Sequence, residues 1–172
     1  MEFFDVLQKR HSYRKAFTAE PVPDSDIKKI IEAGILAPSG MNAQTTSFVV
    51  VTDEGLKREI ASVLSTDAVK TAPVIIAVLT EHVITPCGMA FEIEDYSAAV
   101  ENMLLAAAAL GYATVWMDGM TKQEKTSAEI GRILNIPEGK CVRTILPVGV
   151  PQEKVTQPPR KAFEERCHYN SF

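Results

Sequence analysis

The segment KRHSYRK, residues 9–15, gathers four Lys and Arg side chains near the start of a chain whose net charge is -4. Arg10, Ser12 and Arg14 alternate along it, so in an extended segment they would project toward one common side. Two guanidinium groups and a hydroxyl suit a phosphate monoester, because guanidinium N–H groups form a fork that matches phosphate oxygens. The motif therefore predicts a small phosphate site, with a solvated basic patch as the alternative.

Three further segments carry weaker signals of a ligand site. In APSGMNAQ, residues 37–44, a helix is expected to end in a turn whose backbone N–H groups and polar side chains face outward. In VWMDGM, residues 115–120, an Asp-Gly turn follows the single tryptophan, and its backbone N–H groups would face a planar ligand. In PPRKAFEE, residues 158–165, Arg160 and Lys161 restore positive charge. The alternatives are a plain loop, a hairpin turn and a surface patch, respectively.

The sequence lacks the signatures of several other kinds of site. It has no GxGxxG, GxxxxGK[ST] or GxSxG motif, so it predicts no Rossmann dinucleotide site, P-loop or nucleophile elbow. Its histidines, His11, His82 and His168, are not at metal-ligand spacing with cysteines or carboxylates, and we expect no metal site. An isoelectric point near 5.4 argues against nucleic acid as a partner, because no broad basic surface is available.

The bulk composition bounds the class of protein. With 46% hydrophobic and 23% charged residues, the chain resembles an ordinary soluble globular protein. Its apolar runs are too short to span a bilayer, so we expect no membrane partner. Its three cysteines are odd in number and form no CxxC pair. Together with an acidic N-terminus that lacks a signal peptide, they predict reduced thiols in a cytoplasmic protein.

Apolar periodicity predicts the elements that must position these segments. Helices are expected over residues 2–10, from Asp24 or Ser25 to the residues before Pro38, over 53–65, over 95–112, and from Thr121 onward. Strands are expected over 47–52, 72–80 and 141–150, whereas 81–94 shows no clean period. The 95–112 helix is apolar on nearly all sides, which favours the middle of the core, and Gly111 suits its C-terminal cap. The order α, α, β, α, β, α, α, β predicts one mixed α/β domain over residues 1–172.

Taken together, five motifs resemble the nitroreductase family of FMN flavoproteins. They are, in order, KRHSYRKAF, LAPSGMNAQ, LGYATVWMDG, ILPVGVP and PPRK, and they span nearly the whole chain. The resemblance implies an α+β fold in which helices flank a central, mainly antiparallel sheet. It also implies an intertwined homodimer with FMN at the interface, in which the C-terminal tail of each chain extends onto its partner.

The resemblance assigns cofactor-binding roles to matching residues of this chain. The basic segment would hold the phosphate and part of the flavin ring through Arg10, His11, Ser12 and Arg14. The following loop would reach FMN from the other subunit through Pro38, Ser39, Gly40 and Asn42. Asp118 and Gly119 match a turn whose backbone N–H groups approach N5 and O4 of the flavin. Arg160, with Lys161, would complete the phosphate site.

The resemblance also implies an activity. NADH or NADPH would deliver a hydride to the flavin, and an electron-poor acceptor such as a nitroaromatic or quinone would then take it in a ping-pong cycle. The flavin supplies this chemistry, so we assign no catalytic side chain. Lys70 is the nearest candidate to cover the pyrimidine edge of the flavin. Residues 81–94 replace a longer pocket-shaping insertion of larger members. The alternative is a flavin carrier or FMN-responsive protein with little turnover.

Overall fold

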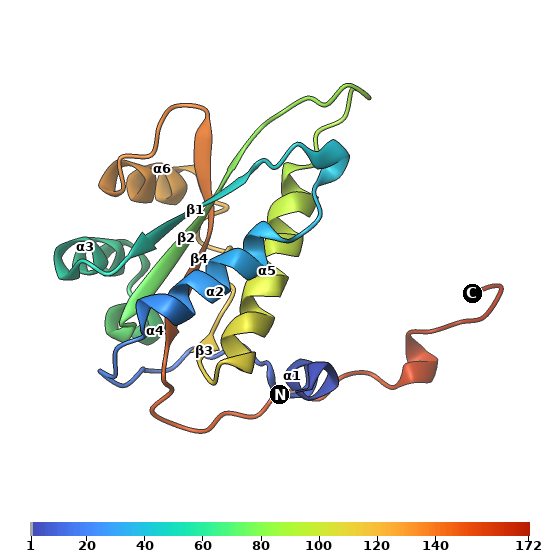
Figure 1. Ribbon diagram of the computed structural model, residues 1–172, viewed down its shortest axis with the longest axis horizontal. Coiled ribbons are helices and arrows are strands. Elements are labelled where there is room, and N and C mark those ends of the chain that lie inside the picture. Colours follow the sequence, from blue (N-terminus) through green and yellow to red (C-terminus); the bar gives the residue numbers. More distant parts are fainter. Residues whose placement is uncertain (1) are drawn as a thin grey trace.

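The computed structural model describes residues 2–172, so Met1 of the expected 1–172 domain lies outside it. The fold centres on a four-stranded sheet (Figure 1). The strands are β1 Thr46–Val51, β2 Val74–Glu81, β3 Ala113–Thr114 and β4 Lys140–Gly149, in the order β1-β2-β4-β3. Each neighbouring pair is antiparallel. The central strands β2 and β4 are buried along most of their length, as the continuous apolar run of β2 predicts.

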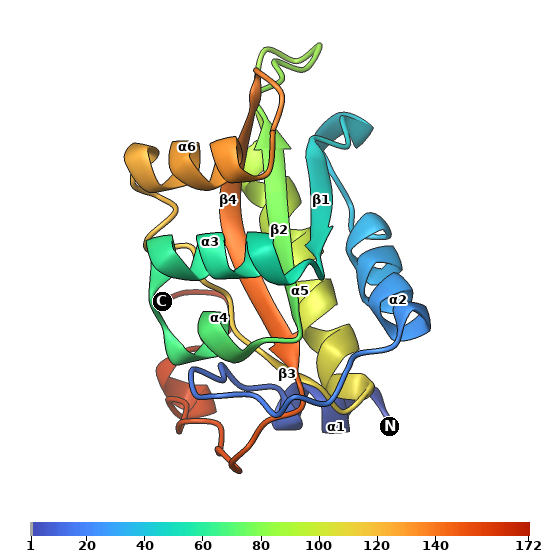
Figure 2. The same cartoon turned by 90° about the vertical axis from the view of Figure 1, so that its left-hand side faces the viewer.

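Helices cover both faces of this sheet. They are α1 Phe3–Lys9, α2 Asp24–Ile35, α3 Glu54–Leu64, α4 Asp67–Thr71, α5 Glu92–Ala109 and α6 Glu124–Ile133, with short 3-10 turns η1 Gly40–Asn42 and η2 Phe163–Glu165. Helices α2 and α5 lie on one face, and α3, α4 and α6 lie on the other (Figures 1 and 2). Side chains of β2 alternate between the two resulting cores, as Ile75 and Ile76 illustrate. The predicted α+β fold with an antiparallel sheet is confirmed.

Helix α5 occupies the middle of its layer, between α2 and the sheet, as its apolar composition predicts. Only Ile93, Glu94 and Ala109 of its 18 residues are exposed. The helix ends at Ala109, its C-cap is Leu110, and the next residue, Gly111, has a φ of +93°, a conformation that glycine adopts without strain. The backbone N–H groups of Gly111 and Tyr112 donate to the carbonyls of Ala108 and Ala107, which forms a Schellman cap.

Several predicted helix starts were wrong. Pro23 occupies the N-cap position of α2, and Asp24 is its first helical residue, so neither Asp24 nor Ser25 is the cap. Helix α6 begins at Glu124, because the Thr121 hydroxyl instead donates to the carbonyl of Arg143 at 2.6 Å. Helix α5 begins three residues before the predicted position, 95. No helix over residues 2–172 is long and apolar enough to cross a membrane.

The C-terminal tail, residues 152–172, leaves the end of β4 and runs away from the body of the chain past α1 (Figure 1). None of its residues is buried, and only Val155, Gln157 and Cys167 are half-buried. Its large apolar side chains, Phe163 and Tyr169 among them, are exposed. The tail therefore packs little against its own chain.

The basic segment is anchored through Tyr13, which is fully buried. The Tyr13 N–H donates to the Thr114 carbonyl of β3 at 2.9 Å. Its hydroxyl donates to the Ala16 carbonyl at 2.6 Å and accepts the Gln152 N–H at 3.0 Å. Tyr13 thus joins the basic segment to β3 and to the start of the tail, while its neighbours on either side point outward.

Replacing Tyr13 by Phe should lower the free energy of unfolding by about 1 kcal/mol, because the Ala16 carbonyl and the Gln152 N–H each lose a bond to the hydroxyl, although they retain the 3.2 Å bond between them. Urea denaturation measures this change. Tyr169→Phe is the matched control, since that hydroxyl is exposed on the tail and its loss should change stability by less than about 0.5 kcal/mol. Equal effects of the two variants would contradict the anchoring role of Tyr13.

Candidate functional site

Arg10 and His11 line a cavity of about 210 Å³ beside the C-terminal half of α5, together with Leu104 and Ala108. The guanidinium Nε of Arg10 lies 3.6 Å from the Glu101 carboxylate, and its side chain is 18% exposed. His11 Nδ1 lies 2.9 Å from the Lys9 carbonyl, and because a carbonyl only accepts, Nδ1 carries a proton. His11 Nε2 is buried and has no partner within residues 2–172. An unpaired buried polar atom of this kind is a candidate ligand contact.

Arg14 and Gly119 line a second cavity, of about 300 Å³, although 105 positions separate them in the sequence. Its remaining walls are mostly apolar: Thr66, Ala68, Val115, Trp116, Met117 and Met120. A Cβ at Gly119 would have no atom within 4 Å, so the backbone of this turn is open to a ligand. The structure therefore brings together the far end of the basic segment and the Asp-Gly turn that the sequence singled out.

Asp118 and Ser12 lie beside these cavities without lining them. The Asp118 carboxylate pairs with Lys122 at 2.9 Å and raises the pKa of that lysine through a hydrogen bond and charge attraction. Its charge is therefore already balanced, and the turn offers a ligand its backbone more than its carboxylate. Ser12 is half-buried and forms a parallel bridge with Thr114 of β3. This bridge places the basic segment against the edge of the sheet.

The 37–44 loop lies at the other end of α5 from the basic segment and lines a different cavity, of about 180 Å³ (Figure 1). Pro38 and Ser39 contribute to that cavity. The Gly40 N–H donates to the Asp95 carboxylate at 2.7 Å, and Asn42 is exposed. Within one chain, the structure does not bring this loop to the cavities of Arg10 or Arg14.

Arg160 and Lys161 are exposed on the tail. Arg160 donates to the Pro158 carbonyl at 3.1 Å, a contact within the tail itself. Neither residue lines the cavities of the basic segment. The structure therefore leaves both cations apart from the candidate phosphate site of their own chain.

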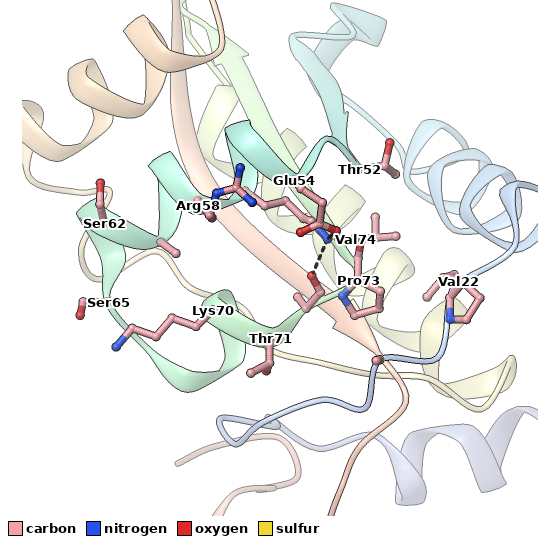
Figure 3. Close-up of a pocket in the computed structure, with 15 residues that line it drawn as sticks. Val22, Thr52, Glu54, Arg58, Ser62, Ser65, Lys70, Thr71, Pro73 and Val74 are labelled. Carbon is pink, nitrogen blue, oxygen red and sulfur yellow. Dashed lines mark hydrogen bonds and ion pairs between the residues drawn. The ribbon is translucent and has the colours of Figure 1, made fainter.

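Lys70 lines a larger cavity, of about 790 Å³, which lies between α3, α4 and the start of β2 (Figure 3). It is exposed, and Figure 3 shows its side chain extending away from Glu54. Lys57 also lines this cavity, where its ammonium donates to the carbonyls of Ala72 and Pro73 and pairs with Glu54. These three partners within the chain satisfy the Lys57 ammonium.

Sequence reasoning missed Thr66 and Ala68 of the Arg14 cavity, and it did not assign Trp116 a lining role. Thr66 is the N-cap of α4 and accepts the Val69 N–H at 3.3 Å. The order Thr-Asp before apolar residues is a recognisable capping signal that would have placed this helix start. Lys70, the candidate for the pyrimidine edge of the flavin, lines a different cavity within its own chain.

Comparison with known proteins places this geometry in a family. The sequence profile of the Nitroreductase family matches residues 7–68 and 59–150. A protein of Archaeoglobus fulgidus with the name "Putative NADH dehydrogenase/NAD(P)H nitroreductase" is 32% identical over 154 residues, which cover 89% of this chain and 87% of that protein. Among solved structures, a Desulfovibrio desulfuricans protein in complex with FMN superposes with a TM-score of 0.82 at 29% identity, covering 100% of this chain and 98% of the other.

A further solved structure is a nicotinamide complex. The NADPH:FMN oxidoreductase of Vibrio harveyi, complexed with NAD+, superposes with a TM-score of 0.84 at 25% identity. It covers 99% of this chain and 77% of the other chain. The matched fold thus extends over essentially all of the chain, including the segments that line the cavities described above.

Proposed function

Since the chain belongs to the nitroreductase family, we propose that it binds FMN in the cavities beside the basic segment and oxidises NADH or NADPH to reduce an electron-poor acceptor, such as a nitroaromatic or a quinone. The observation that carries the proposal is the shared cavity of Arg14 and Gly119. It unites a cation, an open backbone turn and apolar walls. A charged group and a flat apolar ring system are the two halves of a flavin nucleotide.

The residues present fit this cofactor. Arg10 and the unpaired ring nitrogen of His11 supply polar groups for a phosphate in one cavity. Trp116 and Met117 supply apolar surface for a ring in the neighbouring one. FMN, when bound, supplies hydride transfer between a nicotinamide and an acceptor. The chain itself binds and orients the cofactor, and it contributes no catalytic side chain in this proposal.

Arg14 has an electrostatic role. Its guanidinium would lie beside the flavin ring and stabilise negative charge there, which favours electron acceptance. The Asp118–Lys122 pair keeps the nearby carboxylate neutralised, so it does not oppose this effect. Open apolar walls around Gly119 discriminate weakly among flat molecules, which leaves several acceptor classes accessible.

We further propose that two chains complete each flavin site as a homodimer. Pro38, Ser39, Gly40 and Asn42 are assigned to FMN by resemblance, yet their loop lines a different cavity within its own chain. The chain also exposes large apolar side chains on α1, the end of α2, η1 and the tail: Phe3, Phe4, Leu7, Ile35, Leu36, Met41, Phe163, Tyr169 and Phe172. Extended apolar surface of this kind marks a protein interface, and a two-fold axis would use each patch twice.

The tail fits the same proposal. Because it leaves its own body, Arg160 and Lys161 would meet a phosphate only where the tail crosses a second chain. The tail exposes Phe163 and Phe172 and makes little contact with the body of its own chain, so it needs an apolar surface on a partner.

Anaerobic reduction tests the proposed activity. Purified protein loaded with FMN should lose its yellow colour within a rapid-mixing experiment when NADH or NADPH is added, and addition of a nitroaromatic or quinone should restore it. Protein that binds no FMN would overturn the proposal. Bound FMN that neither nicotinamide reduces would instead identify a flavin carrier.

Arg10→Ala tests the phosphate assignment. Loss of a charge-assisted hydrogen bond of about 1.5–3 kcal/mol should weaken FMN binding roughly tenfold to a hundredfold. Riboflavin, which lacks the phosphate, should bind the variant and the wild type alike, as measured by quenching of flavin fluorescence. Lys15→Ala removes an exposed cation of the same segment that lines neither cavity, and it serves as the matched control. Equal weakening for FMN and riboflavin would remove Arg10 from the phosphate site.

A further inference from the structure

Asp95 joins the first turn of α5 to the 37–44 loop and is only 3% exposed. One carboxylate oxygen, Oδ1, accepts the Gly40 N–H at 2.7 Å. The other, Oδ2, accepts the hydroxyl of buried Thr45, also at 2.7 Å. A single side chain therefore holds both ends of the segment that contains η1.

The backbone between these two attachments is strained. Met41, Asn42 and Gln44 have φ values of 52°, 55° and 49°, in the left-handed region that residues other than glycine rarely adopt. Non-glycine residues keep this strained conformation only where contacts with the surrounding structure hold the backbone in place. Inside the loop, the Gln44 N–H donates to the Ser39 hydroxyl at 3.1 Å, and the N–H groups of Asn42 and Ala43 donate to the carbonyls of Ser39 and Gly40 at 3.0 Å. The two bonds to Asp95 are its side-chain attachments to α5.

Gly40 is fitted closely to the same helix. A Cβ added at Gly40 would overlap the ring of Phe91, the residue immediately before α5. The loop backbone therefore approaches the start of α5 as closely as packing permits. This approach aligns the Gly40 N–H with the Asp95 carboxylate.

The stability of the chain does not account for a carboxylate at this place. Within residues 2–172, no cation forms an ion pair with Asp95. A buried carboxylate without a cation costs free energy, which the N-terminal turn of α5 offsets in part through its dipole. Two neutral donors, both belonging to one loop, are what the carboxylate binds. Its effect is thus concentrated on the shape of that loop.

We propose that Asp95 is a positioning residue of the flavin site: it fixes the strained 37–44 loop in the shape that presents Ser39, Gly40 and Asn42 to FMN. This inference rests on the proposed function. Because the loop serves the flavin of the other chain, Asp95 acts across the dimer, and its loss affects a site whose basic segment is intact.

Asp95→Ala removes both acceptors and should weaken FMN binding by about tenfold, because the buried N–H of Gly40 loses its partner and the loop loses its attachment. Asp95→Asn should largely restore binding, since its amide oxygen can accept the Gly40 N–H while its NH₂ group donates to Thr45. Asn102→Ala is the matched control on the same helix. It removes a 3.1 Å bond from Asn102 to the Ala33 carbonyl of α2, which involves no residue of the loop, and should leave FMN affinity within twofold.

Thr45 offers a second pair of variants that keeps the test open if Asp95→Ala does not fold. Thr45→Val removes the hydroxyl that Asp95 binds, whereas Thr45→Ser keeps it. The valine variant should bind FMN more weakly than the serine variant. The positioning role would be overturned if the two Thr45 variants bound FMN with equal affinity and Asp95→Ala either bound FMN as tightly as Asn102→Ala or did not fold.

Mixed dimers give the readout that a merely structural role would not produce. Heterodimers with Asp95→Ala on one chain and Arg10→Ala on the other, isolated through two different affinity tags, contain one intact site and one doubly altered site. They should bind about one FMN per dimer at a concentration that fills the wild type but neither variant homodimer. No recovery in the heterodimer would contradict action across the dimer. If the wild type fails to bind FMN, the proposed function itself is overturned. If the wild type binds FMN and the Asp95 variants bind it equally well, only the positioning role is overturned.

Discussion

Helix α5 must bury most of its surface between α2 and the sheet, and the segments that form the candidate site are attached to it. Asp95 in its first turn holds Gly40. The ring of Tyr96, one residue further on, packs edge-on against Trp116 with centroids 6.1 Å apart. Glu101, near its middle, lies 3.6 Å from Arg10. One rigid apolar helix therefore sets the relative positions of three segments that are distant in the sequence.

The same arrangement explains why the chain alone holds the site in parts. Successive residues of a helix point in different directions, so Asp95 lines the cavity of the 37–44 loop whereas its neighbour Tyr96 packs against Trp116. The cavity of that loop shares no lining residue with the cavity of Arg14 and Gly119. In the dimer that we propose, the loop of one chain meets the basic segment of the other, and the exposed apolar side chains and the tail supply the surface for this contact.

The strands and long helices could be predicted from the sequence because their signals are local. A continuous apolar run indicated β2, and Gly111 marked the cap that follows α5. Helix α4 has only five residues, too few to show a period, and β3 has two, so both depend on tertiary contacts that periodicity does not report.

The candidate site was less accessible to sequence reasoning, because which residues share a cavity depends on packing. Nothing local indicates that Thr66 and not Lys70 faces Arg14, since both belong to one short helical segment. Asp95 also gave no signal: within an apolar helix it resembles a favourable acidic residue of the first turn. Its partners in the loop lie 50 and 55 positions away.

Native mass spectrometry of the FMN-loaded protein measures the central claim most directly, namely that two chains are needed to complete each flavin site. The account predicts a dimer that carries two FMN molecules, together with free monomers that carry none. A monomer that retains one FMN under the same conditions would contradict it.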